Sequence, residues 1–136
     1  LIYGMAKSGV TVLVTTHYMD EAELCQRVGF ISKGRLIALD TPDALKQTQM
    51  YGQVLEINTS NPDGAMRVLK AAQDRQKIPF DEVALYGAQI HAVVPDAEAF
   101  KEPILTLLTN ENIDVHAIEW IAPTLEDVFI SAVKTR

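Results

Sequence analysis

The chain has 136 residues, a net charge of −6 at pH 7 and 48% hydrophobic residues, so it can bury a core and is not typical of a disordered or fibrous protein. The acidic excess, with no cluster of Lys and Arg, argues against a nucleic-acid partner. No apolar stretch approaches the roughly 18 residues of a membrane span, which argues against direct membrane insertion. The single cysteine, Cys25, cannot form an internal disulfide and indicates a reducing compartment.

The first 51 residues carry the pattern of an α/β module. Gly9 stands where a helix would end in the left-handed conformation, and the apolar, β-branched run after it predicts a buried strand. Lys33 and Gly34 lie between two strand-like runs, which is the two-residue spacing of a tight hairpin turn. The expected elements are, in order, a helix end at residues 1–8, a strand at 10–15, a helix at 19–26, hairpin strands at 28–32 and 35–40, and a helix at 42–49 after the cap Thr41.

From Gly52 onward strands alternate with amphipathic helices in the order βαββαβ, and a final helix follows. This order predicts a ferredoxin-like domain, in which both crossover helices cover one face of a four-stranded antiparallel sheet. Pro103 is expected in the first turn of its helix, and Thr124 and Asp127 stand at capping-box spacing. The expected elements are strands at 54–59, 82–86, 89–94 and 115–121, and helices that begin after Asn61, Asp96 and Pro123.

His17 is the residue with the clearest chemical meaning, because it follows the first predicted strand and precedes an acidic helix start. Ligands bind at the carboxyl edge of open α/β sheets. An imidazole placed there can donate a hydrogen bond to a phosphate oxygen and orient an attacking water. The alternative is that His17 only satisfies a loop carbonyl or a helix start, since one histidine makes no site by itself.

The residues around His17 resemble a known family. The runs at residues 9–23 and 27–43 look like the end of an ABC transporter ATPase domain. In that family the histidine that matches His17 is the H-loop histidine, which hydrogen-bonds the γ-phosphate of ATP. The resemblance implies that residues 1–51 are the C-terminal remnant of an ATPase domain, with His17 as its catalytic and ATP-binding residue.

Residues 52–136 resemble the accessory domain that follows the ATPase in many exporter-type ABC proteins, most specifically through residues 122–130. The resemblance implies that the last helix packs against the ATPase core or lies in the ATPase dimer. Because the first residue is Leu, we expect the chain to start within a longer protein. The chain is therefore similar to a C-terminal fragment of the ATP-binding subunit of an ABC exporter.

Most parts of an ATPase site do not occur in this sequence. None of the seven glycines is followed by Lys, so the phosphate-binding Walker A loop is missing, as are the Walker B strand and the Gly-Gly of the signature loop. We expect the intact parent to use ATP and Mg²⁺ to drive transport, and the fragment alone to bind no cofactor and to be inactive. Asp20, Glu21 and Glu23 are interpreted as solvated charges at a helix start, and no metal site is expected.

The resemblance also implies partners and a location. The partners are a membrane-spanning permease subunit and a second ATPase subunit in a homodimer. The chain would be cytoplasmic and peripheral, held at the cytoplasmic face of the cell membrane through its permease. The sequence does not indicate the transported substrate.

The alternative function is that of a regulatory or dimerising βαββαβ module that binds a small molecule or pairs through a sheet edge. His91 alternates with Ile90 and is expected on the opposite face of the sheet. His91 and His116 are interpreted as structural or surface residues, and Trp120 as a side chain that packs in the core or at an interface.

Overall fold

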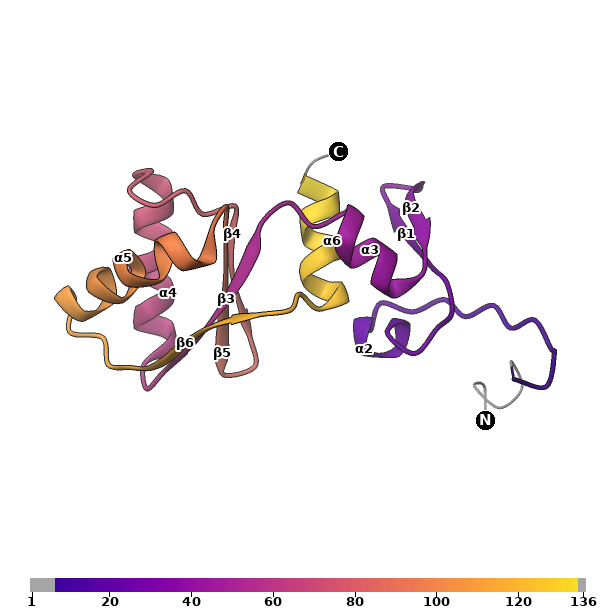
Figure 1. Ribbon diagram of the computed structural model, residues 1–136, viewed down its shortest axis with the longest axis horizontal. Helices are drawn as coiled ribbons and strands as arrows, with labels where there is room; N and C mark the ends of the chain where they lie inside the picture. Colours follow the sequence, from indigo (N-terminus) through magenta and orange to yellow (C-terminus); the bar gives the residue numbers. More distant parts are fainter. Residues whose placement is uncertain (1–6, 135–136) are drawn as a thin grey trace. The chain divides into compact units, whose positions relative to one another are not determined.

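A computed structural model describes residues 7–134 of the chain (Figure 1), which divides into two compact units. One unit comprises the residues up to Met50 together with those from Thr124 onward, and the other comprises Tyr51–Pro123. None of the described helices has the length and apolar character that crossing a bilayer requires. The helices are α2 (Met19–Ala22), α3 (Pro42–Thr48), α4 (Pro62–Asp74), α5 (Ala97–Asn110) and α6 (Leu125–Lys134). The strands are β1 (Val28–Ser32), β2 (Arg35–Asp40), β3 (Gln53–Thr59), β4 (Glu82–Tyr86), β5 (Gln89–Val94) and β6 (Val115–Ile121).

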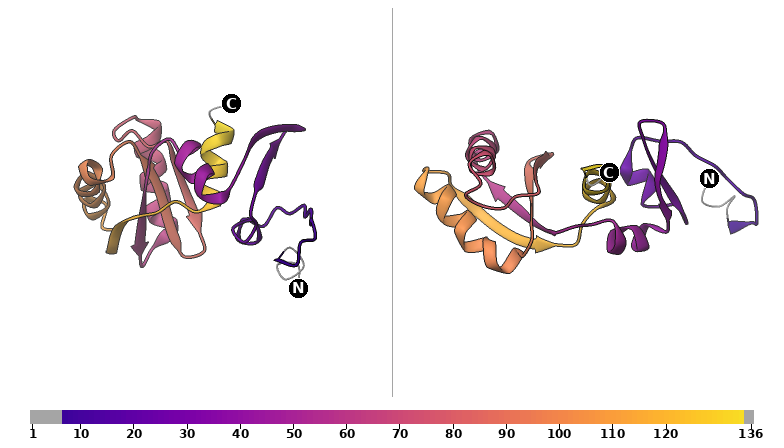
Figure 2. Two further views of the ribbon diagram at one scale, coloured as in Figure 1. Left: turned by 45° about the vertical axis from the view of Figure 1, so that its right-hand side comes forward. Right: turned by 90° about the horizontal axis from the view of Figure 1, so that it is seen from above.

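The second unit is a four-stranded sheet with two helices (Figures 1 and 2). Its strands follow the order β4-β5-β3-β6, and every neighbouring pair is antiparallel. The element order βαββαβ expected from the sequence is therefore observed, and β4 and β6 form the two edges of the sheet. The assignment to the ferredoxin-like fold stays a prediction.

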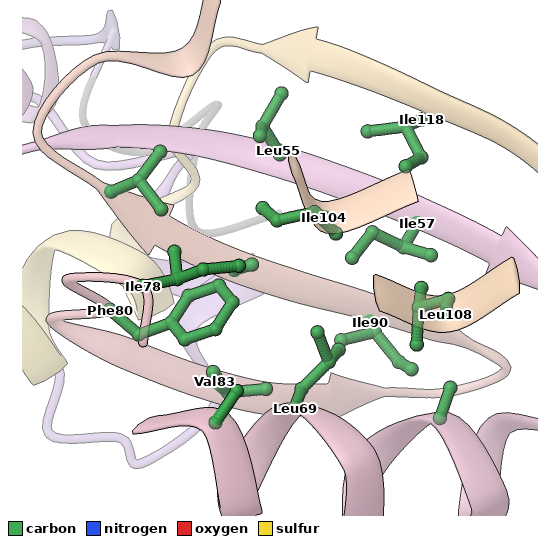
Figure 3. Close-up of a cluster of buried hydrophobic side chains, with 14 of the residues drawn as sticks. Leu55, Ile57, Leu69, Ile78, Phe80, Val83, Ile90, Ile104, Leu108 and Ile118 are labelled. Atoms are coloured by element: carbon green, nitrogen blue, oxygen red, sulfur yellow. The ribbon is translucent and has the colours of Figure 1, made fainter. Parts of the chain in front are cut away.

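The core of the second unit lies between one face of this sheet and both helices (Figure 3). Leu55 and Ile57 face the helices from the central strand β3, and the residue between them, Glu56, belongs to the other face. Because a slip of one residue would expose this whole apolar set, the buried face specifies the register of the sheet. The helices contribute Ala65, Leu69 and Ala72 from α4, and Ala97, Ile104 and Leu108 from α5.

The predicted turns and helix starts are formed largely as the sequence indicates. Lys33 and Gly34 both have positive φ (53° and 76°), which suits the twist of the β1–β2 hairpin. The Thr41 hydroxyl accepts a hydrogen bond from the backbone N–H of Ala44 at 3.2 Å and caps α3. The Asn61 side chain caps α4 in the same way, at 3.0 Å from the N–H of Gly64. These local signals therefore fix where the elements begin.

Pro103 lies in the interior of α5, and the expectation that it belongs to the first turn is wrong. The Asp96 carboxylate accepts hydrogen bonds from the N–H groups of Glu98 and Ala99, so the helix begins at Ala97, well before the proline. Proline cannot donate to the carbonyl four residues earlier, that of Ala99. Both Ala99 and Pro103 are exposed, so water can reach this carbonyl.

Residues 10–15 do not form the predicted strand. A strand needs a neighbour for its backbone N–H and C=O groups and a covering layer for its apolar side chains. Within residues 7–134 the first unit has only the β1–β2 sheet, and neither of its strands pairs with this segment. Leu13 is accordingly 95% exposed. The following helix ends at Ala22 rather than near Gln26, and most of the helix expected at residues 1–8 lies outside the described residues.

Helix α6 supplies the core of the first unit. Its apolar stripe, Leu125, Val128 and Ala132, is buried in one cluster with Ala22, Phe30 and Leu45. The rings of Phe30 and Phe129 meet edge to face with centroids 5.2 Å apart. The sequence pattern groups this helix with residues 52–136, whereas by its contacts it belongs with the residues up to Met50. The physical reason is that a two-stranded hairpin and two short helices offer no other cover for Phe30 and Leu45.

The capping box predicted at the start of α6 is confirmed. The backbone N–H of Thr124 donates to Asp127 Oδ2 at 2.9 Å, and the N–H of Asp127 donates back to Thr124 Oγ1 at 3.2 Å. The Thr124 hydroxyl also lies 3.0 Å from Asp127 Oδ2. Two helix-terminal donors are thereby satisfied.

Replacement of Thr124 by Ala should destabilise α6 by about 1 kcal/mol, because the N–H of Asp127 loses its acceptor. The measurement is hydrogen exchange of the α6 amides. Glu126→Ala, an exposed residue of the same turn, is the control and should change the opening free energy by less than about 0.5 kcal/mol. Equal exchange rates in the two variants would contradict the assigned role of the cap.

Replacement of Leu69 by Ala should lower the free energy of unfolding of the second unit by about 2 to 5 kcal/mol, because it leaves a cavity where the side chain is fully buried. Urea unfolding followed by the fluorescence of Trp120 measures this loss. Leu85→Ala, at a position 44% exposed on β4, should cost much less. A similar loss in both variants would contradict the placement of the core.

Candidate functional site

His17 lies in the irregular segment that leads into α2, and it is exposed. Its ring packs against that of Tyr18, with centroids 4.1 Å apart and an interplanar angle of 36°. The N–H of Tyr18 donates to Thr16 Oγ1 at 3.0 Å, so the backbone turns here without help from the histidine. The imidazole is therefore accessible to a ligand from outside the chain.

The acidic residues beside His17 divide into two kinds. Asp20 and Glu21 are exposed in the first turn of α2, where the helix dipole favours negative charge. Glu23 instead pairs with Lys46 of α3, whose Nζ lies 2.8 Å from Oε1 and 3.0 Å from Oε2. This half-buried pair joins the end of α2 to α3, so Glu23 has a structural role.

The described residues do not form a complete phosphate or metal site. Residues 7–134 hold no group of three or more His, Cys, Asp or Glu side chains able to bind a metal ion. The sequence has no phosphate-binding loop either, because none of its glycines precedes Lys. The residues present therefore do not fit ATP with Mg²⁺ as a resident cofactor. What His17 can do is donate a hydrogen bond to a phosphate oxygen, or donate to or accept from a water, that other groups hold in place.

His91 is positioned by the sheet of the second unit. Its side chain is buried, on the face opposite Ile90 as predicted, and its Nε2 lies 3.1 Å from Glu56 Oε2 on the neighbouring strand. The Tyr86 ring packs on the imidazole with centroids 4.5 Å apart. The interpretation of His91 as structural agrees with this packing. The sequence does not reveal Glu56 as its partner, because that requires the register of β3 against β5.

The other singled-out residues lie at the surface or in local contacts. His116 is exposed on β6, as interpreted from the sequence. Trp120, on the same edge strand, is 59% exposed and is not a core residue, so only its interpretation as an interface residue stays open. Cys25 is half-buried, and its thiol lies 3.7 Å from the carbonyl oxygen of Glu21.

Comparisons with known proteins point to one family. Residues 41–133 match the model of "ATP-binding protein DrrA1-3-like, C-terminal domain". The daunorubicin resistance ATP-binding protein DrrA2 of Streptomyces coeruleorubidus is 32% identical over 130 residues, which cover 95% of this chain and 40% of that protein.

Two further relatives match shorter segments. The probable multidrug ABC transporter ATP-binding protein YbhF of Escherichia coli (strain K12) is 60% identical over 45 residues, which cover 33% of this chain and 8% of that protein. The Nod factor export ATP-binding protein I of Mesorhizobium japonicum is 33% identical over 91 residues, which cover 66% of this chain and 25% of that protein. The chain thus spans less than half the length of each of these relatives.

Replacement of Lys46 by Gln should speed hydrogen exchange in α2 by up to about fivefold, because a partly exposed ion pair contributes about 0.2 to 1 kcal/mol. The control, Arg35→Gln, removes one exposed positive charge from β2 and should leave α2 unchanged. If Lys46→Gln does not alter exchange in residues 19–24, the pair does not hold this segment.

Proposed function

The chain belongs to the family of DrrA1-3-like ATP-binding proteins, and from this premise we propose that it is the C-terminal part of the ATP-binding subunit of an ABC exporter. The observation that carries the proposal is the combination of a family match over residues 41–133 with a relative aligned over 95% of the chain. In the intact subunit, ATP binding and hydrolysis with Mg²⁺ would be coupled to export.

Within this proposal the two parts of the chain have different roles. Residues 1–51 are the C-terminal remnant of the ATPase domain and contain the H-loop, and residues 52–136 are the accessory domain. Helix α6 is the last helix of residues 52–136, yet it packs in the unit that contains His17. The end of the chain would therefore stabilise the ATPase remnant directly.

His17 would act as the H-loop residue, with its imidazole hydrogen-bonded to the γ-phosphate of ATP and beside the attacking water. Phosphoryl transfer depends mainly on positioning and on stabilisation of charge at the phosphate oxygens, and one imidazole donor serves both. Its exposure and its place directly before α2 support this role. The phosphate-binding loop and the Mg²⁺ ligands would come from other parts of the intact subunit, so the chain alone should not hydrolyse ATP.

The proposal also names partners and a location. A membrane-spanning permease would carry the substrate, and a second ATP-binding subunit would complete a homodimer. The subunit would be cytoplasmic and would reach the membrane through its permease. The relatives named for daunorubicin resistance, multidrug transport and Nod factor export support the exporter class without indicating the substrate of this protein.

The test is His17→Ala in the full-length subunit. ATPase kcat should fall by about 10²- to 10³-fold, the effect of removing one donor that stabilises the transition state, while the fold is retained. His116→Ala, an exposed histidine on β6, is the matched control and should retain normal activity. Normal ATPase and transport activity after His17→Ala would refute the H-loop role.

A further inference from the structure

The two edges of the second unit's sheet differ in how well they are protected. β4, at one edge, has five residues, and its Glu82 is held by Lys70 of α4 at 3.7 Å. β6, at the other edge, has seven residues, and within the described part of the chain no strand lies along its outer side. Neither strand contains Lys or Pro, the residues that commonly block strand addition at an edge, so the two edges differ in length and in the ion pair of Glu82. β6 is therefore the edge better suited to accept another strand.

The two sides of this unit also differ in charge. Residues 62–86, which form α4 and β4, contain four acidic and four basic residues. Residues 96–121, which run from the cap of α5 to the end of β6, contain six acidic residues and one basic residue, Lys101. The side of the unit formed by α5 and β6 is thus the acidic one, and Glu119 is the acidic residue within β6 itself.

Two neighbouring residues give this edge both apolar and charged groups. Trp120 is 59% exposed, although its register partner on β3, Leu55, is fully buried. Glu119 is exposed on the other face of the sheet, opposite Glu56. An added strand would present alternate side chains to these two faces, an apolar one beside Trp120 and a cationic one beside Glu119.

We propose that β6 is a docking edge for an extended, Lys/Arg-rich segment of the membrane-spanning partner, which adds to the sheet as a fifth strand. This inference rests on the proposed exporter function. Main-chain hydrogen bonds to β6 would supply affinity, and contacts with Trp120 and Glu119 would supply specificity. The cytoplasmic loops of membrane proteins carry an excess of Lys and Arg, so their charge complements this acidic edge.

A second copy of the chain fits this edge less well. A two-fold pair of β6 strands would bring two sides together that each carry six acidic residues and one basic residue. Like charges placed across neighbouring strands are destabilising. The charge of the edge therefore favours a basic partner over self-association.

The proposal can be tested with two synthetic peptides and the full 136-residue chain. The first probe alternates Lys with Val over eight residues, and the second has the same charge with Pro in place of Val, so that it cannot form a ladder. Backbone amide shifts in NMR titrations locate the binding site. We expect the Lys/Val peptide to shift the amides of β6 and the side-chain N–H of Trp120, and the Lys/Pro peptide to bind at least about tenfold more weakly.

Matched variants distinguish binding at the β6 edge from nonspecific attraction of a basic peptide to an acidic chain. Trp120→Ala should weaken binding of the Lys/Val peptide by about tenfold, whereas Leu85→Ala on the β4 edge should not change it. Glu119→Lys should also weaken binding by about tenfold, whereas Asp74→Lys, the same charge change at the end of α4, should have little effect. Preserved amide spectra of the variants show that each still folds.

Three results would overturn the proposal. They are equal binding of the two peptides, amide shifts along β4 instead of β6, and self-association of the chain that Trp120→Ala abolishes. These measurements contain no ATP and do not involve His17. A failure here would leave the proposed ATPase role intact, and a failure of the His17 test would leave the peptide result intact.

Discussion

The first unit depends on the burial of Phe30 and Leu45 beneath helix α6. The β1–β2 hairpin and helices α2 and α3 present apolar side chains but are too short to bury them alone. Helix α6 closes this cluster, and Ala22 of α2 is part of it. The helix that follows His17 is thus anchored by residues from the far end of the sequence. A change in the α6 stripe would therefore reach the candidate site through packing rather than through direct contact.

In the second unit the constraint is the register of the sheet. One face of this sheet is covered by α4 and α5, and these two helices do not cover the other face. The helix-facing residues specify register through burial. On the other face the buried His91 is paired with Glu56, and the Tyr86 ring packs against it. The two sides of this unit differ in charge, because residues 62–86 carry equal numbers of acidic and basic residues whereas residues 96–121 are acidic, and Trp120 is exposed on β6.

Local chemistry explains why most elements could be predicted from sequence. The Lys33-Gly34 turn and the Thr41 cap each depend only on residues close in sequence, and the structure contains both as predicted. The predictions that failed concern the strand at residues 10–15 and the position of Pro103 in its helix. Residues 10–15 have strand-like composition but no neighbouring strand in the described chain. α5 begins after Asp96 as expected, but Pro103 lies in its interior and not in its first turn.

The sequence by itself determined the order of elements from β1 onward and their caps and turns, because these depend on periodicity and on contacts between near neighbours. Only the tertiary structure decided that α6 packs with the first unit, that Glu56 is the partner of His91, and that Trp120 stays exposed on an open edge. The physical reason is that burial and strand register are set by residues far apart in the chain, and no local pattern encodes which of them meet.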